Sequence, residues 1–167
     1  MAEGLFITRK DLVKFTSVNG SVDSDKFLQY IKIAQDIHIR NYLGTDLYNK
    51  IQDDIEASSL TGDYLSLVTD YVKPMLIHWA MVEYLPFAAY TIANKGVFKH
   101  GSENASNVEK DEIDFLIEKE RNIAQYYTDR FIDYMSFNAS GKYPKYYTNS
   151  NDDVYPDKNA NFEGWVL

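Results

Sequence analysis

The segment that most constrains this chain is residues 63–95, because its second half presents apolar side chains on every side of a helix. One stripe recurs at helical spacing and consists of Leu65, Val68, Val72, Leu76, Trp79, Phe87 and Tyr90. The remaining sides are filled by Ile77, Ala80, Met81, Leu85, Ala88 and Ile92. A helix that is apolar all round must be enclosed by other elements. We therefore expect residues 63–95 to form the central helix of a bundle.

Two prolines lie inside this predicted central helix. Pro74 and Pro86 each remove a backbone donor and clash with the preceding turn, so the helix should kink or break at one of them. We expect the break at Pro86. The apolar run 75–93 also contains His78 and Glu83, which makes it a poor candidate for a membrane span. Burial in protein is the expected alternative.

Three shorter helices are predicted before the central one. Thr8, followed three residues later by Asp11, is a start signal for a first helix. A second helix begins near Ser24, carries an apolar stripe, and ends at Gly44, as expected for a glycine that follows a helix. Thr45 is expected to cap a third helix, which is short and amphipathic.

A fifth, long helix is predicted after a polar loop. Lys95-Gly96 closes the central helix, and residues 97–107 have no apolar periodicity. Ser106 and Glu109 have the spacing of a capping box, which predicts that the fifth helix starts there. Its apolar residues keep the helical spacing to about Asn138.

The fifth helix also carries aromatic residues on the side opposite its apolar stripe. Phe115, Tyr126 and Phe137 add more aromatic surface than one core stripe requires. We therefore predict that these three residues form a partner-binding face that a neighbouring subunit covers.

Periodicity stops at residue 139, and prolines, glycines, asparagines and aspartates follow. The sequence thus predicts an all-α fold: a helical bundle of about five helices over residues 1–138, then an extended C-terminal tail over residues 139–167. The tail is rich in aromatic residues, and partner binding is assigned to Tyr143, Tyr146, Tyr147, Tyr155, Phe162 and Trp165. Either the tail folds back over its own domain or it reaches another chain. Its extended length of up to about 95 Å favours a neighbour.

Composition excludes several classes of function. The net charge is −8, so the basic surface needed to wrap nucleic acid is missing, and an acidic surface is expected to let DNA slide past. The absence of cysteine excludes disulfides and thiolate chemistry. The first residues lack a secretory pattern, so we expect a protein that is intracellular when made and has no membrane association.

No motif for nucleotide binding or nucleophilic catalysis is present, and we expect no enzymatic activity and no cofactor or bound metal. One constellation remains as an alternative. His38, Glu83 and Glu120 fall in or near apolar stripes of three predicted helices, where they would serve as acid, base or metal ligands. Polar residues in such stripes are more often paired with a neighbouring side chain, and we favour that structural interpretation.

The order of these signals resembles a known family. The resemblance is carried by the N-terminal segment 5–12, Ile39 to Gly44, Thr45 to Tyr48, the central Pro74 to Phe87 and the break at 94–96. With the long fifth helix, they are similar to head-to-tail connectors of phages, in particular to ring proteins of crAss-like phages. The resemblance covers about residues 5–138.

The resemblance implies a structural virion protein made in the host cytoplasm and placed at the head-tail junction. It implies a homo-oligomeric ring, a dodecamer, beneath the portal protein and above the next tail or ring protein. Genome DNA would pass through without sequence-specific binding. Two other functions stay open: a monomeric helical module that binds one protein partner, and a metal or acid-base enzyme that uses His38, Glu83 and Glu120.

Overall fold

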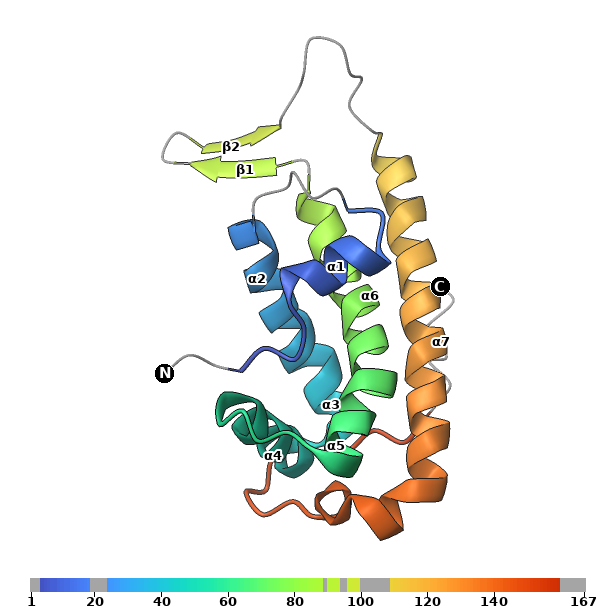
Figure 1. Ribbon diagram of the computed structural model, residues 1–167. Coiled ribbons are helices and arrows are strands. Elements are labelled where there is room, and N and C mark those ends of the chain that lie inside the picture. Colours follow the sequence, from blue (N-terminus) through green and yellow to red (C-terminus); the bar gives the residue numbers. More distant parts are fainter. Residues whose placement is uncertain (1–3, 19–23, 89, 94–95, 100–108, 160–167) are drawn as a thin grey trace.

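The computed structural model describes residues 4–18, 24–88, 90–93, 96–99 and 109–159. The predicted all-α class is confirmed, since helices pack side by side and the one sheet among the described residues is a short hairpin at one end (Figure 1). No helix among the described residues is both long and apolar enough to cross a membrane.

The first predicted start signal is confirmed. Helix α1 spans Arg9–Phe15, and the Asp11 carboxylate accepts a hydrogen bond of 2.7 Å from the backbone N–H of Thr8, as a capping box requires. Leu12 of this helix is buried. The α1 helix therefore lies across the bundle with one apolar residue inserted into the core (Figure 1).

The second predicted helix is a continuous rod with a π turn inside it. Helix α2 spans Ser24–Ala34, the π turn η1 spans Gln35–Ile39, and α3 spans Arg40–Leu43. It ends at Gly44 as predicted. The fully buried Gln35 in the π turn accepts a bond from the Phe6 N–H at 2.9 Å and donates one to the Tyr48 hydroxyl, also at 2.9 Å. A single buried amide thus joins three segments of the chain.

The third predicted helix is α4, Thr45–Glu56, but Thr45 does not cap it. The N-cap is Gly44, and Thr45 is the first helical residue. The Thr45 hydroxyl instead donates to the Asp153 carboxylate at 2.9 Å and accepts from the Val154 N–H at 3.2 Å. The cap prediction is wrong because a distant segment of the chain competes for that hydroxyl.

The central helix is confirmed in position and character. Helix α5 spans Gly62–Leu67, the π turn η2 spans Val68–Val72, and α6 spans Lys73–Tyr84. Eight of the twelve α6 residues are buried: Met75, Leu76, Ile77, Trp79, Ala80, Met81, Val82 and Tyr84. Pro74 lies in the first turn of α6, where a missing N–H is tolerated.

The predicted break at Pro86 is confirmed, but the predicted extension of the helix to Lys95 is wrong. A short 3-10 turn, η3 (Leu85–Phe87), follows α6, and the chain then forms a two-stranded antiparallel hairpin. Strand β1 is Tyr90–Ala93 and strand β2 is Gly96–Lys99, with Ala93 opposite Gly96. Once Pro86 has ended the helix, β-branched and aromatic residues here fit a strand as well as a helix.

Helix α7, Lys110–Lys142, packs along the length of α6. It starts after a capping box in which Glu109 is the N-cap and Glu112 its partner, so Glu109 does not have the predicted place three residues after the cap. Ser106, the predicted cap, lies outside the described residues. Buried Thr128 accepts a hydrogen bond of 3.0 Å from the Trp79 indole and donates one of 2.8 Å to the Ala124 carbonyl. This chain of bonds fixes the register of α7 against α6.

The predicted start of an extended tail at residue 139 is wrong. Helix α7 continues to Lys142, and a 3-10 turn, η4 (Pro144–Tyr147), follows it. The next residues run back over the junction of α3 and α4, where the Thr45 N–H donates 3.0 Å to the Val154 carbonyl. The Asp157 N–H donates a hydrogen bond of 2.8 Å to the Asn41 carbonyl. Residues 143–159, the C-terminal segment, therefore belong to the bundle.

Gly44 is the position where this docking demands glycine. Its φ of +76° and ψ of 156° fall in a region that only glycine adopts readily. A Cβ added there would lie 2.7 Å from both Cγ and Cδ of Pro156. The backbone turn and the close approach of the C-terminal segment thus depend on the same residue.

We predict that Gly44→Ala lowers the free energy of unfolding by about 1–3 kcal/mol, because alanine must strain the backbone and displace Pro156. Urea unfolding followed by circular dichroism measures this loss. Gly141→Ala is the matched control, since nothing lies within 4 Å of the added Cβ and the residue is helical. An equal loss in both variants would contradict the role assigned to Gly44.

Candidate functional site

The structure brings together two residues of the predicted acid-base constellation, His38 and Glu83, and pairs the third, Glu120, with a different histidine. His38 Nε2 lies 2.8 Å from Glu83 Oε1, whereas Glu120 Oε2 lies 2.6 Å from Nδ1 of another histidine, His78. His38 and Glu83 pair η1 with α6, and His78 and Glu120 pair α6 with α7. Each of the two carboxylates is thus hydrogen-bonded to a histidine, which is the kind of pairing that the structural interpretation expects.

Both histidines also stack on aromatic rings. The His38 ring lies 4.0 Å from the Trp79 ring, nearly parallel to it, and His78 lies 5.5 Å from Tyr127 in the same manner. Among the described residues, no group of three or more His, Cys, Asp and Glu side chains is placed to hold a metal ion. Each pair joins α6 to a neighbouring element, η1 or α7.

Burial lowers the pKa of His38, and its hydrogen bond with Glu83 opposes that shift without cancelling it. The folded protein thus binds a proton at His38 less readily than the unfolded chain does. The contribution of His38 to the free energy of unfolding is therefore fully present above the ordinary histidine pKa of about 6.5. It is lost as the pH falls through the lower pKa of His38 in the folded protein.

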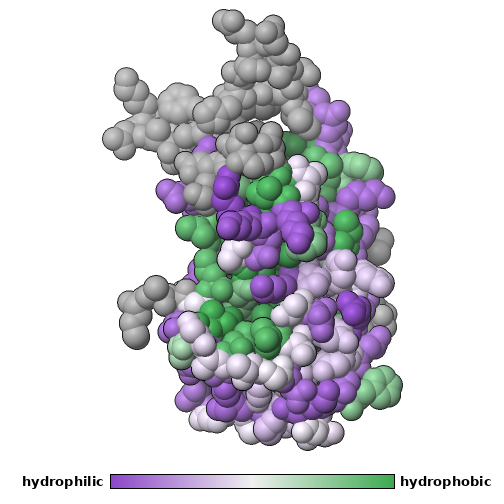
Figure 2. Space-filling view, in the orientation of Figure 1, coloured by the Kyte–Doolittle hydropathy of each residue, from purple (hydrophilic) through white to green (hydrophobic). Residues whose placement is uncertain are grey.

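The exposed side of α7 matches the predicted aromatic face. Phe115 is 57% exposed, Tyr126 is 64% exposed and Phe137 is 85% exposed. Successive members are 11 residues apart, which is close to three helical turns, so all three lie on one side of α7. Figure 2 shows apolar side chains between charged ones along the edge formed by α7.

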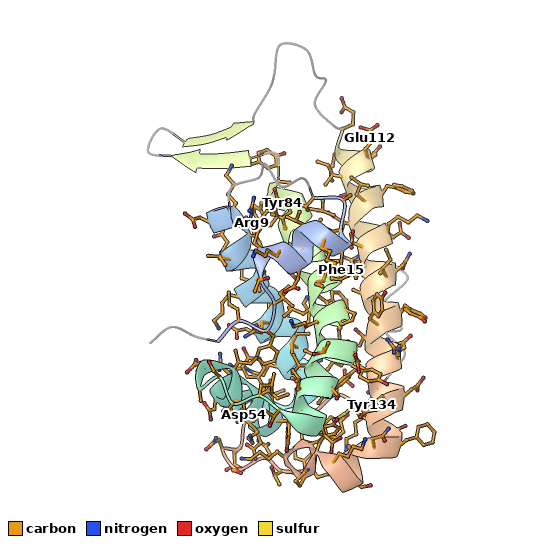
Figure 3. All side chains as sticks on the ribbon, viewed as in Figure 1. Arg9, Phe15, Asp54, Tyr84, Glu112 and Tyr134 are labelled. Carbon is orange, nitrogen blue, oxygen red and sulfur yellow. The ribbon has the colours of Figure 1, made fainter. Side chains whose placement is uncertain are left out.

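The N-terminal half of α7 is also poorly covered by the rest of the chain. The first fully buried residue of this helix is Ala124, and Leu116 and Ile123 are 46% and 41% exposed. Glu112 marks the end of α7 that rises above α1 (Figure 3). The described part of the chain thus leaves apolar residues of 110–123 without full cover.

Beside this part of α7 lies a groove that the sequence analysis missed. Two adjoining hollows of about 720 and 450 Å³ share Val82, Glu83 and Arg121. Their acidic lining residues are Glu83, Asp114, Glu118 and Asp157. Arg121 and His38 are the basic residues, and Pro86, Ile117 and Ile37 add apolar surface. We name it the acidic groove. Its carboxylates come from two helices and the C-terminal segment, so no local motif announces it.

The predicted tail residues fall into three groups. Tyr143 and Tyr146 are buried in the bundle, so their assignment to partner binding is wrong as it stands. Tyr147 and Tyr155 are 44% and 55% exposed, and their role in partner binding stays a prediction. Phe162 and Trp165 lie outside the described residues.

The buried tyrosines hold the C-terminal segment on its own domain. The Tyr143 hydroxyl donates a hydrogen bond of 2.9 Å to the Asp63 carbonyl and lies 3.0 Å from the Tyr134 hydroxyl. Desolvation raises the pKa of the Tyr146 phenol to about 12. Both rings fill the core where α7 ends, near Tyr134 in Figure 3.

Asp46 supplies the polar part of this docking. One of its carboxylate oxygens accepts bonds from the Thr148 hydroxyl at 2.6 Å, the Ser150 hydroxyl at 2.6 Å and the Ser150 N–H at 3.0 Å. These donors lower the pKa of Asp46 to about 2, with the Ser150 hydroxyl the largest cause. The ionised carboxylate thus binds the C-terminal segment throughout the neutral range.

We predict that Asp46→Asn loosens the C-terminal segment, because an amide replaces the charged acceptor of three hydrogen bonds. Limited proteolysis with mass spectrometry should then show faster cleavage within residues 148–153 than in the unchanged protein. Asp53→Asn, at an exposed site on α4, is the control and should leave the cleavage rate as it was. Identical cleavage in both variants would show that Asp46 does not hold the segment.

The lowered pKa of His38 leads to a second prediction. As the pH is lowered from about 8 to about 5, the unchanged protein should lose more unfolding free energy than His38→Gln, because only the former takes up a proton at residue 38 on unfolding. Urea unfolding at several pH values measures the difference. A difference that does not change with pH would refute the burial effect.

Comparison with known proteins gives one family match, the family of unknown function DUF6712, over residues 39–155. No curated protein and no solved structure matches the chain. The matched range includes α6, α7, most residues of the acidic groove and most of the docked C-terminal segment. Because the match covers more than half of the sequence, this chain belongs to the family of unknown function DUF6712.

Proposed function

We propose that this protein is a structural subunit of a phage head-to-tail connector. Copies would form a homo-oligomeric ring beneath the portal, at the head-tail junction of the virion, through which genome DNA passes. The observation that carries the proposal is the exposed apolar surface of α7, which includes Phe115, Tyr126 and Phe137. The proposal includes no catalytic step.

The exposed residues of α7 supply free energy for association. Full burial of one large apolar side chain stabilises by about 1.5–3 kcal/mol. Five such side chains of α7 are between 41% and 85% exposed in the single chain. Covering five such residues in a neighbouring copy would contribute about 4–9 kcal/mol. This is of the same order as the entropy cost of association, so other contacts must add to the interface. A helix surface of this kind is typical of a subunit interface.

The charge of the chain is compatible with a DNA channel. With a net charge of −8, the protein offers little of the counterion-releasing cationic surface on which nonspecific DNA binding depends. A ring of such subunits would let DNA move past without holding it. The resemblance to phage connectors over about residues 5–138 supports the same proposal.

One observation favours a second candidate, a monomeric helical module that binds a single protein partner. The C-terminal segment to Asn159 docks on its own chain through Asp46, Thr45 and Asn41. A docked segment has no need of a neighbour for its order. The two candidates differ in solution mass and in the symmetry of any assembly.

The test is assembly of the purified protein, measured by light scattering after size exclusion and by electron microscopy over a wide range of concentration. We predict rings with rotational symmetry for the unchanged protein. A variant with Phe115, Tyr126 and Phe137 all changed to Ser should stay monomeric with unaltered unfolding, because those side chains are exposed in the monomer.

The matched control is Phe15→Ser with Leu65→Ser, which removes exposed apolar side chains from α1 and α5. It should assemble normally. A protein that is monomeric at every concentration, and that also binds one partner at a ratio of one to one, would contradict the ring and favour the module.

A further inference from the structure

The β1–β2 hairpin projects from the bundle instead of packing within it. Figure 1 shows it above the ends of α2 and α6, directed away from α7. Its two strands, Tyr90–Ala93 and Gly96–Lys99, pair only with each other in a two-stranded sheet. A two-stranded hairpin alone in water is marginally stable at best. A surface that covers it would therefore stabilise it.

The hairpin also differs in charge from the rest of the protein. Between Glu83 and Glu103 the sequence has no acidic residue, and it contains Lys95, Lys99 and His100. Removing the +2 of the two lysines from the net charge of −8 leaves −10 for the rest of the chain. The hairpin is thus a cationic element on an acidic protein.

The acidic groove has the complementary character. Four of its lining residues carry carboxylates, and Arg121 is its one guanidinium among the described residues. Ile117, Val82 and Pro86 give it an apolar floor for non-polar side chains. Asp114 and Glu118 lie one turn apart on α7, where both can meet cations on an approaching strand.

We infer that the β1–β2 hairpin of one copy docks in the acidic groove between α6 and α7 of the next copy. This inference rests on the proposed function and identifies a second contact in the ring, beside the exposed aromatic face of α7. Opposite charges meet across the interface, which steers association and fixes register.

The placement of the two surfaces suits a closed ring. In Figure 1 the hairpin points away from α7, whereas the lining residues of the groove belong mainly to α6 and α7. Each subunit then offers one surface and receives the other. Such head-to-tail contacts generate rings when the rotation between copies closes.

Site-directed cross-linking tests the contact, because the chain contains no cysteine. One protein carries Ala93→Cys at the hairpin end and a second carries Glu118→Cys in the groove. The two are mixed under a glutathione redox buffer, and the disulfide-linked heterodimer is measured by non-reducing electrophoresis and peptide mass spectrometry. The control pair replaces Glu118→Cys with Asp53→Cys on α4.

Docking should raise the yield of the heterodimer about tenfold or more over the control pair, because bound thiols meet at a high effective concentration. Equal yields for the two pairs would overturn the inference. A chain that carries both cysteines and closes on itself as a monomer would also overturn it, since the hairpin would then dock in its own groove.

Charge reversal is the second measurement. Lys95→Glu with Lys99→Glu, or Asp114→Lys with Glu118→Lys, should each weaken association about tenfold, and mixing the two variants should restore it. Asp53→Lys with Asp133→Lys is the control for altered net charge. Rings that form without the Ala93–Glu118 cross-link would overturn this contact and leave the proposed function standing, whereas a cross-linked pair that never closes into a ring would do the reverse.

Discussion

The structure depends on enclosing α6, a helix with apolar residues on every side. Exposing any face of α6 to water would cost the free energy that is gained by burying its apolar side chains. The rod from α2 to α3, helix α7 and helix α1 therefore all lie against it. The polar contacts of the core follow from this arrangement. Trp79 reaches Thr128, His38 reaches Glu83 and His78 reaches Glu120, each joining α6 to a neighbour.

Sequence periodicity was enough to predict this arrangement of helices, because three- and four-residue spacing reports directly on which face is buried. It was not enough where long-range contacts decide the outcome. Thr45 looked like a helix cap but binds Asp153, and Tyr146 looked like a partner contact but is buried. The partners of His38 and Glu120 depend on how α6 is rotated between its neighbours, which a linear pattern does not specify.

The two ends of the molecule differ, because the C-terminal segment docks on only one of them. At one end, Gly44, Asp46 and Tyr143 close the chain on itself, so that end is complete in a monomer. The other end carries the projecting hairpin and the thinly covered half of α7, and the acidic groove extends from there to Asp157 of the C-terminal segment. Assembly through the second end would leave the first free to serve as a rigid support.

Hydrogen exchange compared between the monomer and the assembled protein tests this division most directly. The account predicts that amides of residues 144–157 are equally protected in both states, because their hydrogen bonds form within one chain. It predicts that residues 90–99 and 110–123 gain protection only on assembly. Unprotected amides at 144–157 in the monomer that become protected in the assembly, with no change at 90–99, would contradict it.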